Sequence, residues 1–318
     1  MEPPLLPPPV EQTIAKLVNP DKPLLDSWLT DLSSLNSAEL KLLEQAWPTI
    51  EPKRRRQIMY RLVELAEDNF ELDFDNLFKG RIKDTDAEVR SKAIEGLWEN
   101  EESSLIEPLI DLLEKDKSEK VQAAAATALG KFALLAELEK LRPNYRDKVS
   151  RSLLSVINDQ TKPVEVKRRA LEAAAPLTRP QMKKAIAEAY QSGDNKLKIS
   201  ALFAMGKSGN TSWLPIMLKE LTSTDTEIRY EAAGACGELG EEEAATYLCE
   251  MVNDPDIDVR LAAVQALGKI GGPEAKGCLE KCLNHPDEAI RETAKQALSQ
   301  LEAEEDPLFS RMENFAED

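Results

Sequence analysis

Four cysteines and a single histidine carry the most reactive side chains of this 318-residue chain. The cysteines, Cys236, Cys249, Cys278 and Cys282, all lie in its C-terminal third. Cys278 and Cys282 are four residues apart, so on a helix their thiols share one face and could bind one metal ion, although a structural zinc site needs four converging ligands. His285 follows closely and could act as a general base. Which of these chemical roles is possible depends on the secondary-structure elements that position the cysteines and the histidine.

An internal repeat defines those elements. The segment DPDIDVRLAAVQALGKIG, at 254–271, contains a Val-Arg pair, an alanine three residues later, and then a small residue, leucine and glycine. Six other segments repeat this pattern, and a degenerate earlier unit lies at 51–68. The polar residues of the seven pairs are Arg90, Gln122, Lys167, Lys198, Arg229, Arg260 and Arg291. The last four intervals are 31 residues each, and the longer interval before them predicts an insertion near 133–146.

Each repeat is predicted to be a pair of helices. In 242–253, apolar residues recur three and four positions apart, as in an amphipathic helix. Asp254 is expected to cap the next helix, with Pro255 at its first position and Gly271 at its end. One such hairpin cannot bury its apolar face alone, so neighbours must stack. The sequence therefore predicts an all-α fold, a right-handed α-solenoid of about seven to eight helical hairpins.

The pattern VRxxAxxALG after an Asp-Pro-Asp turn resembles HEAT repeats, specifically the short class called PBS-lyase HEAT-like repeats. The resemblance covers 84–301 well and 37–68 weakly. It implies a polar ladder between repeats, formed by the turn aspartate and the arginine six residues later, such as Asp254 and Arg260. His285 takes the place of that aspartate in the last repeat, which would interrupt the ladder. The resemblance implies a fold and no particular function.

The two ends differ from the repeats. Residues 1–23 are rich in proline and are expected to form an extended arm. Residues 24–302 are expected to form the solenoid, with 24–68 as a degenerate N-terminal cap and 69–302 as regular repeats. The remaining residues, 303–318, form an acidic tail.

The repeat register also predicts where the cysteines and His285 lie. In its register Cys236 falls on the signature leucine. Cys278 and Cys282 align with Tyr247 and Met251 in one repeat and with Ile216 and Glu220 in another, so one of the two positions is apolar core. We therefore expect the four cysteines to lie on different faces, as free thiols in a reducing cytoplasm, with no bound metal or other cofactor. His285 sits at a turn and is interpreted as a capping residue. The iron-dependent deoxyhypusine hydroxylases resemble this repeat class but use several His-Glu pairs, which one histidine cannot supply.

The charge of the chain bears on its partners. It has 58 acidic and 41 basic residues, for a net charge of −17, which opposes binding to nucleic acid or anionic membranes. Basic clusters at 53–56 and 167–169 are interpreted as solvated helix starts, which disfavours a relation to the HEAT-like alkylpurine DNA glycosylases. No run of about 18 apolar residues is present, and the N-terminus does not resemble a secretory signal. We expect a cytoplasmic monomer.

The remaining candidate site is the inner, concave face of the array. The first and fifth positions after each polar residue point away from the core in the predicted register, and in the middle of the array they are Arg168, Glu172, Ile199, Phe203, Tyr230 and Leu261. Exposed apolar residues in contiguous repeats often mark a partner site. The alternative is that these side chains pack on adjacent helices.

The sequence thus predicts a non-catalytic scaffold or adaptor that binds a protein or peptide on this face. The competing hypothesis is a lyase-like or oxidoreductase-like enzyme, which the name of the repeat class suggests. No nucleophile and base at a recognisable spacing support it, and no phosphate-binding or zinc-protease motif is present.

Overall fold

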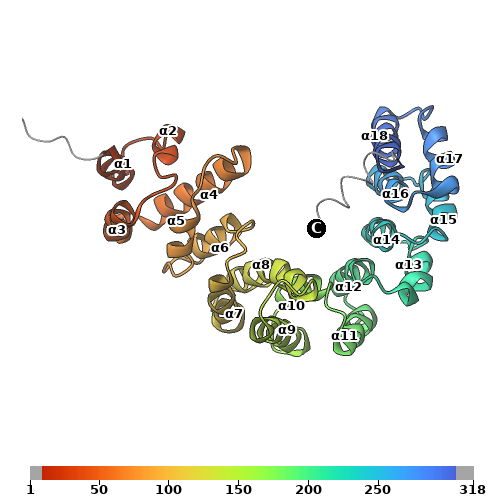
Figure 1. Cartoon of the computed structure of the whole chain (residues 1–318), viewed down its shortest axis with the longest axis horizontal. Coiled ribbons are helices and arrows are strands. Elements are labelled where there is room, and N and C mark those ends of the chain that lie inside the picture. The colour runs from red at the N-terminus through yellow and green to blue at the C-terminus, as the bar shows by residue number, and fades with distance from the viewer. Residues whose placement is uncertain (1–8, 306–318) are drawn as a thin grey trace, which may run out of the picture. The chain divides into compact units, whose positions relative to one another are not determined.

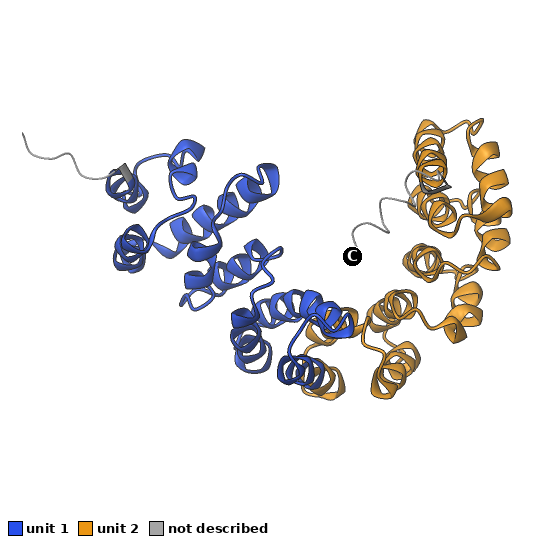
Figure 2. Ribbon diagram, viewed as in Figure 1, with its two compact units in different colours: residues 1–152 blue, residues 153–318 orange. Residues whose placement is uncertain are grey.

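The computed structural model describes residues 9–305, and all regular structure in that range is helical (Figure 1). The chain forms two compact units, residues 1–152 and 153–318 (Figure 2). Eight repeats each contribute a first helix, α3 to α17 with odd numbers, and a second helix, α4 to α18 with even numbers. The predicted all-α solenoid of helical hairpins is confirmed.

Unit 1 begins with two helices that precede the repeats. Its helices are α1 (Pro9–Val18), α2 (Asp26–Thr30), α3 (Ser37–Ala46), α4 (Pro52–Asp68), α5 (Asp75–Arg81), α6 (Ala87–Gly96), α7 (Ile106–Lys115), α8 (Glu119–Glu137) and the first part of α9 (Pro143–Asn158). Short 3-10 turns at Trp47–Thr49 and Ser103–Leu105 complete it. At 19 residues α8 is long, and the expected insertion at 133–146 falls on its last turn, the link to α9 and the first turn of α9.

Unit 2 holds the most regular repeats. Its helices after α9 are α10 (Val164–Ala174), α11 (Pro180–Gln191), α12 (Asn195–Lys207), α13 (Leu214–Glu220), α14 (Thr226–Leu239), α15 (Ala244–Met251), α16 (Ile257–Ile270), α17 (Gly272–Cys282) and α18 (Glu288–Glu305). The second helices α12, α14, α16 and α18 pack side by side in chain order (Figure 1).

The ends of the chain depart from expectation where the structure describes them. Residues Pro9–Val18 form helix α1, whereas an extended arm was expected over 1–23. The helix forms because Val10, Ile14 and Leu17 recur at helical spacing, and all three are buried. The last helix, α18, continues to Glu305, three residues into the predicted acidic tail. Residues 1–8 and 306–318 lie outside the described part of the chain.

The second helices begin two residues later than the sequence suggested. The side chain of Asp256 accepts hydrogen bonds from the backbone N–H groups of Asp258 and Val259, at 2.9 and 3.2 Å, and so caps α16. The expectation that Asp254 is the cap, with Pro255 inside the helix, is wrong. Asp254 instead accepts a hydrogen bond from the N–H of Asp256 and faces the preceding repeat.

That orientation creates an arginine–aspartate ladder between repeats. Arg229 of one repeat donates from Nε and Nη2 to the two carboxylate oxygens of Asp254 in the next, at 2.8 and 2.9 Å. Its Nη1 donates to the carbonyl of Ser223 in its own turn, six residues earlier. In unit 1, Arg90 makes the same pair of bonds to Asp116. Two parallel charge-assisted bonds hold adjacent repeats in a defined register.

The ladder is interrupted at His285, as the sequence predicted. The imidazole Nδ1 accepts a hydrogen bond from the backbone N–H of Asp287 at 3.1 Å, which reproduces the bond that Asp254 accepts from Asp256. It offers no carboxylate to Arg260, whose Nε is buried without a partner. The Nη2 of Arg260 lies 3.6 Å from Asp287, a longer contact than the paired rungs make.

Completing the ladder should therefore stabilise the protein. In the variant His285→Asp, the new carboxylate should accept from Arg260 and raise the free energy of unfolding by about 1 kcal/mol. Urea denaturation measures this. An aspartate near the start of α18 could also stabilise the helix dipole, so the same change should be made in an Arg260→Ala background. An equal gain in both backgrounds would show that no rung had formed.

Glycine and alanine set how closely the second helices approach. A Cβ added at Gly237 would lie 2.7 Å from the Cα of Ala266 in the next repeat, and one at Gly206 would lie 2.8 Å from the Cα of Ala235. Gly268 stands in the same relation to Ala297, at 2.7 Å from its Cβ. The signature glycine of each of these repeats thus lets two helix backbones touch, and no larger residue fits without a shift.

This close approach predicts opposite effects for two glycines of the same helix. Gly237→Ala should lower the free energy of unfolding by about 1 kcal/mol or more, because overpacking against a backbone outweighs the better helix propensity of alanine. Gly234→Ala, where no atom lies within 4 Å of the added Cβ, should raise it by about 0.5 to 1 kcal/mol. Both are measurable by thermal or urea unfolding. Similar signs for the two variants would contradict the proposed backbone contact.

Candidate functional site

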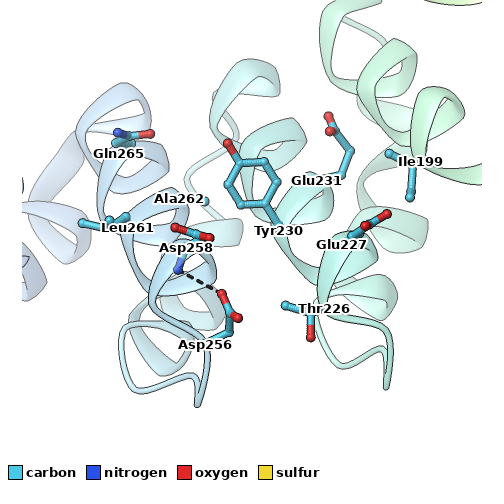
Figure 3. A pocket seen from close by; sticks show the side chains of 10 residues that line it. All are labelled: Ile199, Thr226, Glu227, Tyr230, Glu231, Asp256, Asp258, Leu261, Ala262 and Gln265. Atoms are coloured by element: carbon cyan, nitrogen blue, oxygen red, sulfur yellow. Dashed lines mark hydrogen bonds between the residues drawn. The ribbon is translucent and has the colours of Figure 1, made fainter. Parts of the chain in front are cut away.

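Three of the predicted site residues come together in a groove on the second helices of unit 2. Ile199 on α12, Tyr230 on α14 and Leu261 on α16 occupy the same repeat position, 31 residues apart, and all three line it (Figure 3). The cavity has a volume of about 520 Å³. Because consecutive second helices pack directly against each other, residues one repeat apart become neighbours in this groove.

Tyr230 is the most exposed large side chain of the groove. Its side chain projects from α14 between the lining residues of α16 and Ile199 (Figure 3), and the residue is 48% exposed. Ile199 and Leu261 are half-buried, so each keeps part of its surface open to solvent. Phe203, one turn after Ile199, is also half-buried but does not line the groove.

Arg168 and Glu172 do not line the groove either, because neighbouring side chains engage them. Arg168 donates from Nε to the hydroxyl of Ser200 on α12 at 3.0 Å and pairs with Glu165 at 2.8 Å. The same hydroxyl donates to Glu172 at 2.6 Å, and Glu172 also pairs with Arg169. These residues connect α10 to α12, and their charges are largely satisfied within the protein.

Four acidic residues of the groove were missed in the sequence. Glu227 and Glu231 come from α14, and Asp256 and Asp258 from the start of α16. No lysine or arginine is among the lining residues. The repeat contained a signal for two of them, because Glu227 and Asp258 hold the same position, three residues before Tyr230 and Leu261.

Glu231 is held in an unfavourable environment for a charged carboxylate. Burial, together with the negative charge of Glu172 on α10, raises its pKa to about 7. The positive charge of Arg168 on α10 opposes this effect but does not cancel it. Within the described residues, no hydrogen bond or ion pair satisfies the Glu231 carboxylate. A negative charge on this residue therefore lacks a partner in the protein itself.

The cysteines are arranged differently from expectation. Cys249 on α15 and Cys278 and Cys282 on α17 line one cavity of about 360 Å³ together with His285. The expectation that the four cysteines lie on different faces is wrong for these three. First helices of adjacent repeats pack with an offset that brings position 249 beside 278, although the 31-residue register aligns 249 with 280. Hydrogen bonding to Cys282 raises the pKa of the Cys278 thiol.

Cys236 lies apart from this cluster, on α14. It is fully buried at the position of the signature leucine, as predicted, and burial raises its pKa to about 12. Within residues 9–305 no set of three or more histidine, cysteine, aspartate or glutamate side chains is arranged to hold a metal ion. Nor is any helix of that range long and apolar enough to cross a membrane.

Comparison with known proteins identifies the repeats. The family description "HEAT repeats" matches residues 74–158, 182–256 and 248–308, which together exceed half of the chain. The protein belongs to the HEAT-repeat family. A search of curated proteins found no match.

Several solved HEAT-like structures resemble this one. The complex of CpcE and CpcF of phycocyanin lyase from Nostoc sp. PCC7120 is 22% identical, with 76% of this chain and 92% of that chain covered and a TM-score of 0.52. The Kap95:Nup1 complex is 12% identical, with 96% and 47% covered and a TM-score of 0.51. Human deoxyhypusine hydroxylase is 17% identical, with 92% and 96% covered and a TM-score of 0.36. At these identities the likeness concerns the fold.

The environment of Glu231 makes a prediction about stability and pH. Its pKa in the folded HEAT-repeat protein, about 7, exceeds its usual value of 4.5, so the fold favours the protonated form. Stability must then fall as pH rises from about 5 to about 8. Because one pKa unit corresponds to about 1.4 kcal/mol, the loss should be about 2 kcal/mol.

Urea unfolding of the wild type and Glu231→Gln at both pH values measures this effect. The glutamine variant should lack this part of the pH dependence and gain stability relative to the wild type as pH rises. Equal pH dependence in the two proteins would show that the Glu231 carboxylate is well solvated.

Proposed function

We propose that this HEAT-repeat protein is a non-catalytic scaffold or adaptor that binds a protein or peptide in the groove on α12, α14 and α16. The observation that carries the proposal is Tyr230, a large aromatic side chain exposed beside Ile199 and Leu261 inside a cavity. Aromatic residues with one polar end are enriched in protein interfaces because they bury much area at little conformational cost. The groove is built on packed helices, so its side chains are presented by a rigid surface.

The states of Cys236 and His285 support a role without catalysis. The thiol of Cys236 is fully buried with a raised pKa, and a raised pKa makes the nucleophilic thiolate rare. The Nδ1 atom of His285 is already engaged by a backbone N–H. Neither residue lines the groove.

The proposal also concerns the cellular compartment of the protein and the class of its partner. Free thiols, as at Cys236, fit a reducing compartment such as the cytoplasm. A net charge of −17 favours a protein partner over nucleic acid or an anionic membrane. Two of the similar structures are protein complexes, CpcE with CpcF and Kap95 with Nup1. We propose that this chain acts as a monomer toward its partner.

A matched pair of tyrosines tests the proposal. Tyr230 and Tyr247 are similarly exposed, at 48% and 45%, but Tyr247 lies on the first helix α15. Immobilised Tyr230→Ala protein should recover partners from extracts of its own cells at least about tenfold less well than the wild type, as expected for an aromatic hot spot. Tyr247→Ala should recover them normally, with both variants shown to be folded by thermal unfolding. Undiminished capture by Tyr230→Ala would place the binding surface elsewhere.

A further inference from the structure

We propose that the groove recognises a basic segment of its partner, with an arginine or lysine side chain over Tyr230 between Glu227 and Asp258, and apolar side chains against Ile199 and Leu261. This inference rests on the proposed function, because it specifies the chemistry of the partner in the same groove. Three observations carry it: the unpaired charges of the groove, the pattern of charge along the repeats, and the exposed tyrosine ring.

The acidic residues of the groove are not engaged in ion pairs with other described residues. None of Glu227, Glu231, Asp256 and Asp258 forms an ion pair within the described part of the chain. Nearby acidic residues of unit 2 do form them: Glu220 pairs with Lys198 at 2.8 Å, and Glu238 pairs with both Lys207 and Lys269. Charges of one sign in a recess focus the electrostatic potential and attract the opposite charge.

The repeat shows where a positive charge is missing. In six of the seven repeats the position two residues before the polar residue of the pair is charged. In chain order from α6 it is occupied by Glu88, Lys120, Glu165, Lys196, Glu227 and Asp258, and the seventh repeat has Ala289 there. The sign alternates until Glu227 and Asp258, which are two acids in succession. In unit 1 the alternation produces an ion pair between Lys120 and Glu88. In unit 2 the corresponding neighbours of α14 and α16 are both negative, so an incoming cation would take the place of the missing lysine.

Unit 1 also shows how this fold places a cation on a tyrosine. The Nζ of Lys92 lies 4.6 Å from the centre of the Tyr60 ring, and that of Lys120 lies 6.0 Å from it while pairing with Glu88. Tyr60 further donates its hydroxyl proton to Glu88 at 2.9 Å. Tyrosine, acid and lysine thus satisfy one another within the protein. Tyr230 stands beside acids, and no lysine between residues 9 and 305 lies over its ring, so a partner could supply the corresponding cation.

The apolar part of the groove defines the rest of the ligand. Ile199 and Leu261 flank Tyr230 from the neighbouring helices, and Ala262 lies beside Leu261. A purely charged ligand would leave this surface exposed. A segment in which basic and apolar side chains alternate or share one face would cover this apolar surface and also pair with the acidic residues.

Glu231 connects binding to pH. The charges that act on its carboxyl are Glu172 and Arg168 on α10, while Glu227 on its own helix and Asp258 on α16 share its groove. A bound cation stabilises the ionised carboxylate, whereas the protonated form offers it no charge. With a pKa of about 7, the ionised fraction rises about tenfold between about pH 6 and about pH 8. Affinity for a basic segment should rise by up to that factor.

Synthetic peptides test the inference on the full-length protein. The probe is a fluorescein-labelled peptide of about ten residues with alternating arginine and leucine. One control peptide replaces arginine by glutamate, and another replaces leucine by serine. Fluorescence anisotropy at about 0.15 M NaCl measures each affinity under screening that suppresses long-range attraction. The arginine–leucine peptide should bind the wild type at least about tenfold more tightly than either control.

Two charge reversals separate the groove from the general acidity of the protein. Asp258→Lys places a cation in the groove, and Glu280→Lys makes the same change of net charge on the exposed face of α17. The first should weaken binding of the arginine–leucine peptide at least about tenfold, and the second less than about twofold. Tyr230→Ala should weaken it and Tyr247→Ala should not. Glu231→Gln should abolish the rise in affinity between about pH 6 and about pH 8.

The outcomes distinguish the two proposals. Equal losses for Asp258→Lys and Glu280→Lys would overturn the inference, since the attraction would then be non-specific. Tyr230-dependent binding of the glutamate–leucine peptide instead would overturn it but leave the groove as a partner site. If capture of the cellular partner does not depend on Tyr230, the proposed function itself fails.

Discussion

The close approach of consecutive second helices is the constraint on which the rest of unit 2 depends. At Gly206, Gly237 and Gly268 an added Cβ would meet an alanine of the next repeat at less than 3 Å, so these helices pack backbone against backbone. This spacing makes residues of adjacent repeats direct neighbours. Ion pairs, hydrogen bonds and the groove all follow from it, because each requires side chains about one repeat apart in sequence to meet in space.

Ion pairs between adjacent repeats then decide which charged side chains stabilise the fold. The Arg229–Asp254 pair shows the usual solution, in which a cation of one repeat meets an anion of the next. Two departures from that pattern leave charges unsatisfied. At His285 the anion is missing, and the Nε of Arg260 is buried without a partner. In the groove the cation is missing, and Glu227 and Asp258 remain unpaired on an open surface. Burial favours a stability role for the first, and access to solvent favours a binding role for the second.

Membership of the HEAT-repeat family accounts for the architecture and leaves the function to local differences between repeats. The CpcE–CpcF complex of phycocyanin lyase and the Kap95:Nup1 complex resemble this architecture at 22% and 12% identity. What distinguishes this chain is a tyrosine among unpaired acids on one part of unit 2, and three thiols converging on a separate cavity between first helices. Function therefore depends on those residues, because repeats that are interchangeable in the core differ at their exposed positions.

The sequence alone determined the repeat, the helical hairpins and the face that carries Ile199, Tyr230 and Leu261, because the helical period sets which residues share a face and the 31-residue spacing sets which repeats correspond. Only the tertiary structure decided that Arg168 and Glu172 are engaged by neighbours, that Glu231 is half-buried without an ion pair, and that three cysteines converge. The physical reason is that contacts between packed helices are offset from the repeat register: Gly237 meets Ala266, 29 residues away. Which side chains pair, how far they are buried and how their pKa values shift all depend on that offset. The periodicity of a single helix does not reveal it.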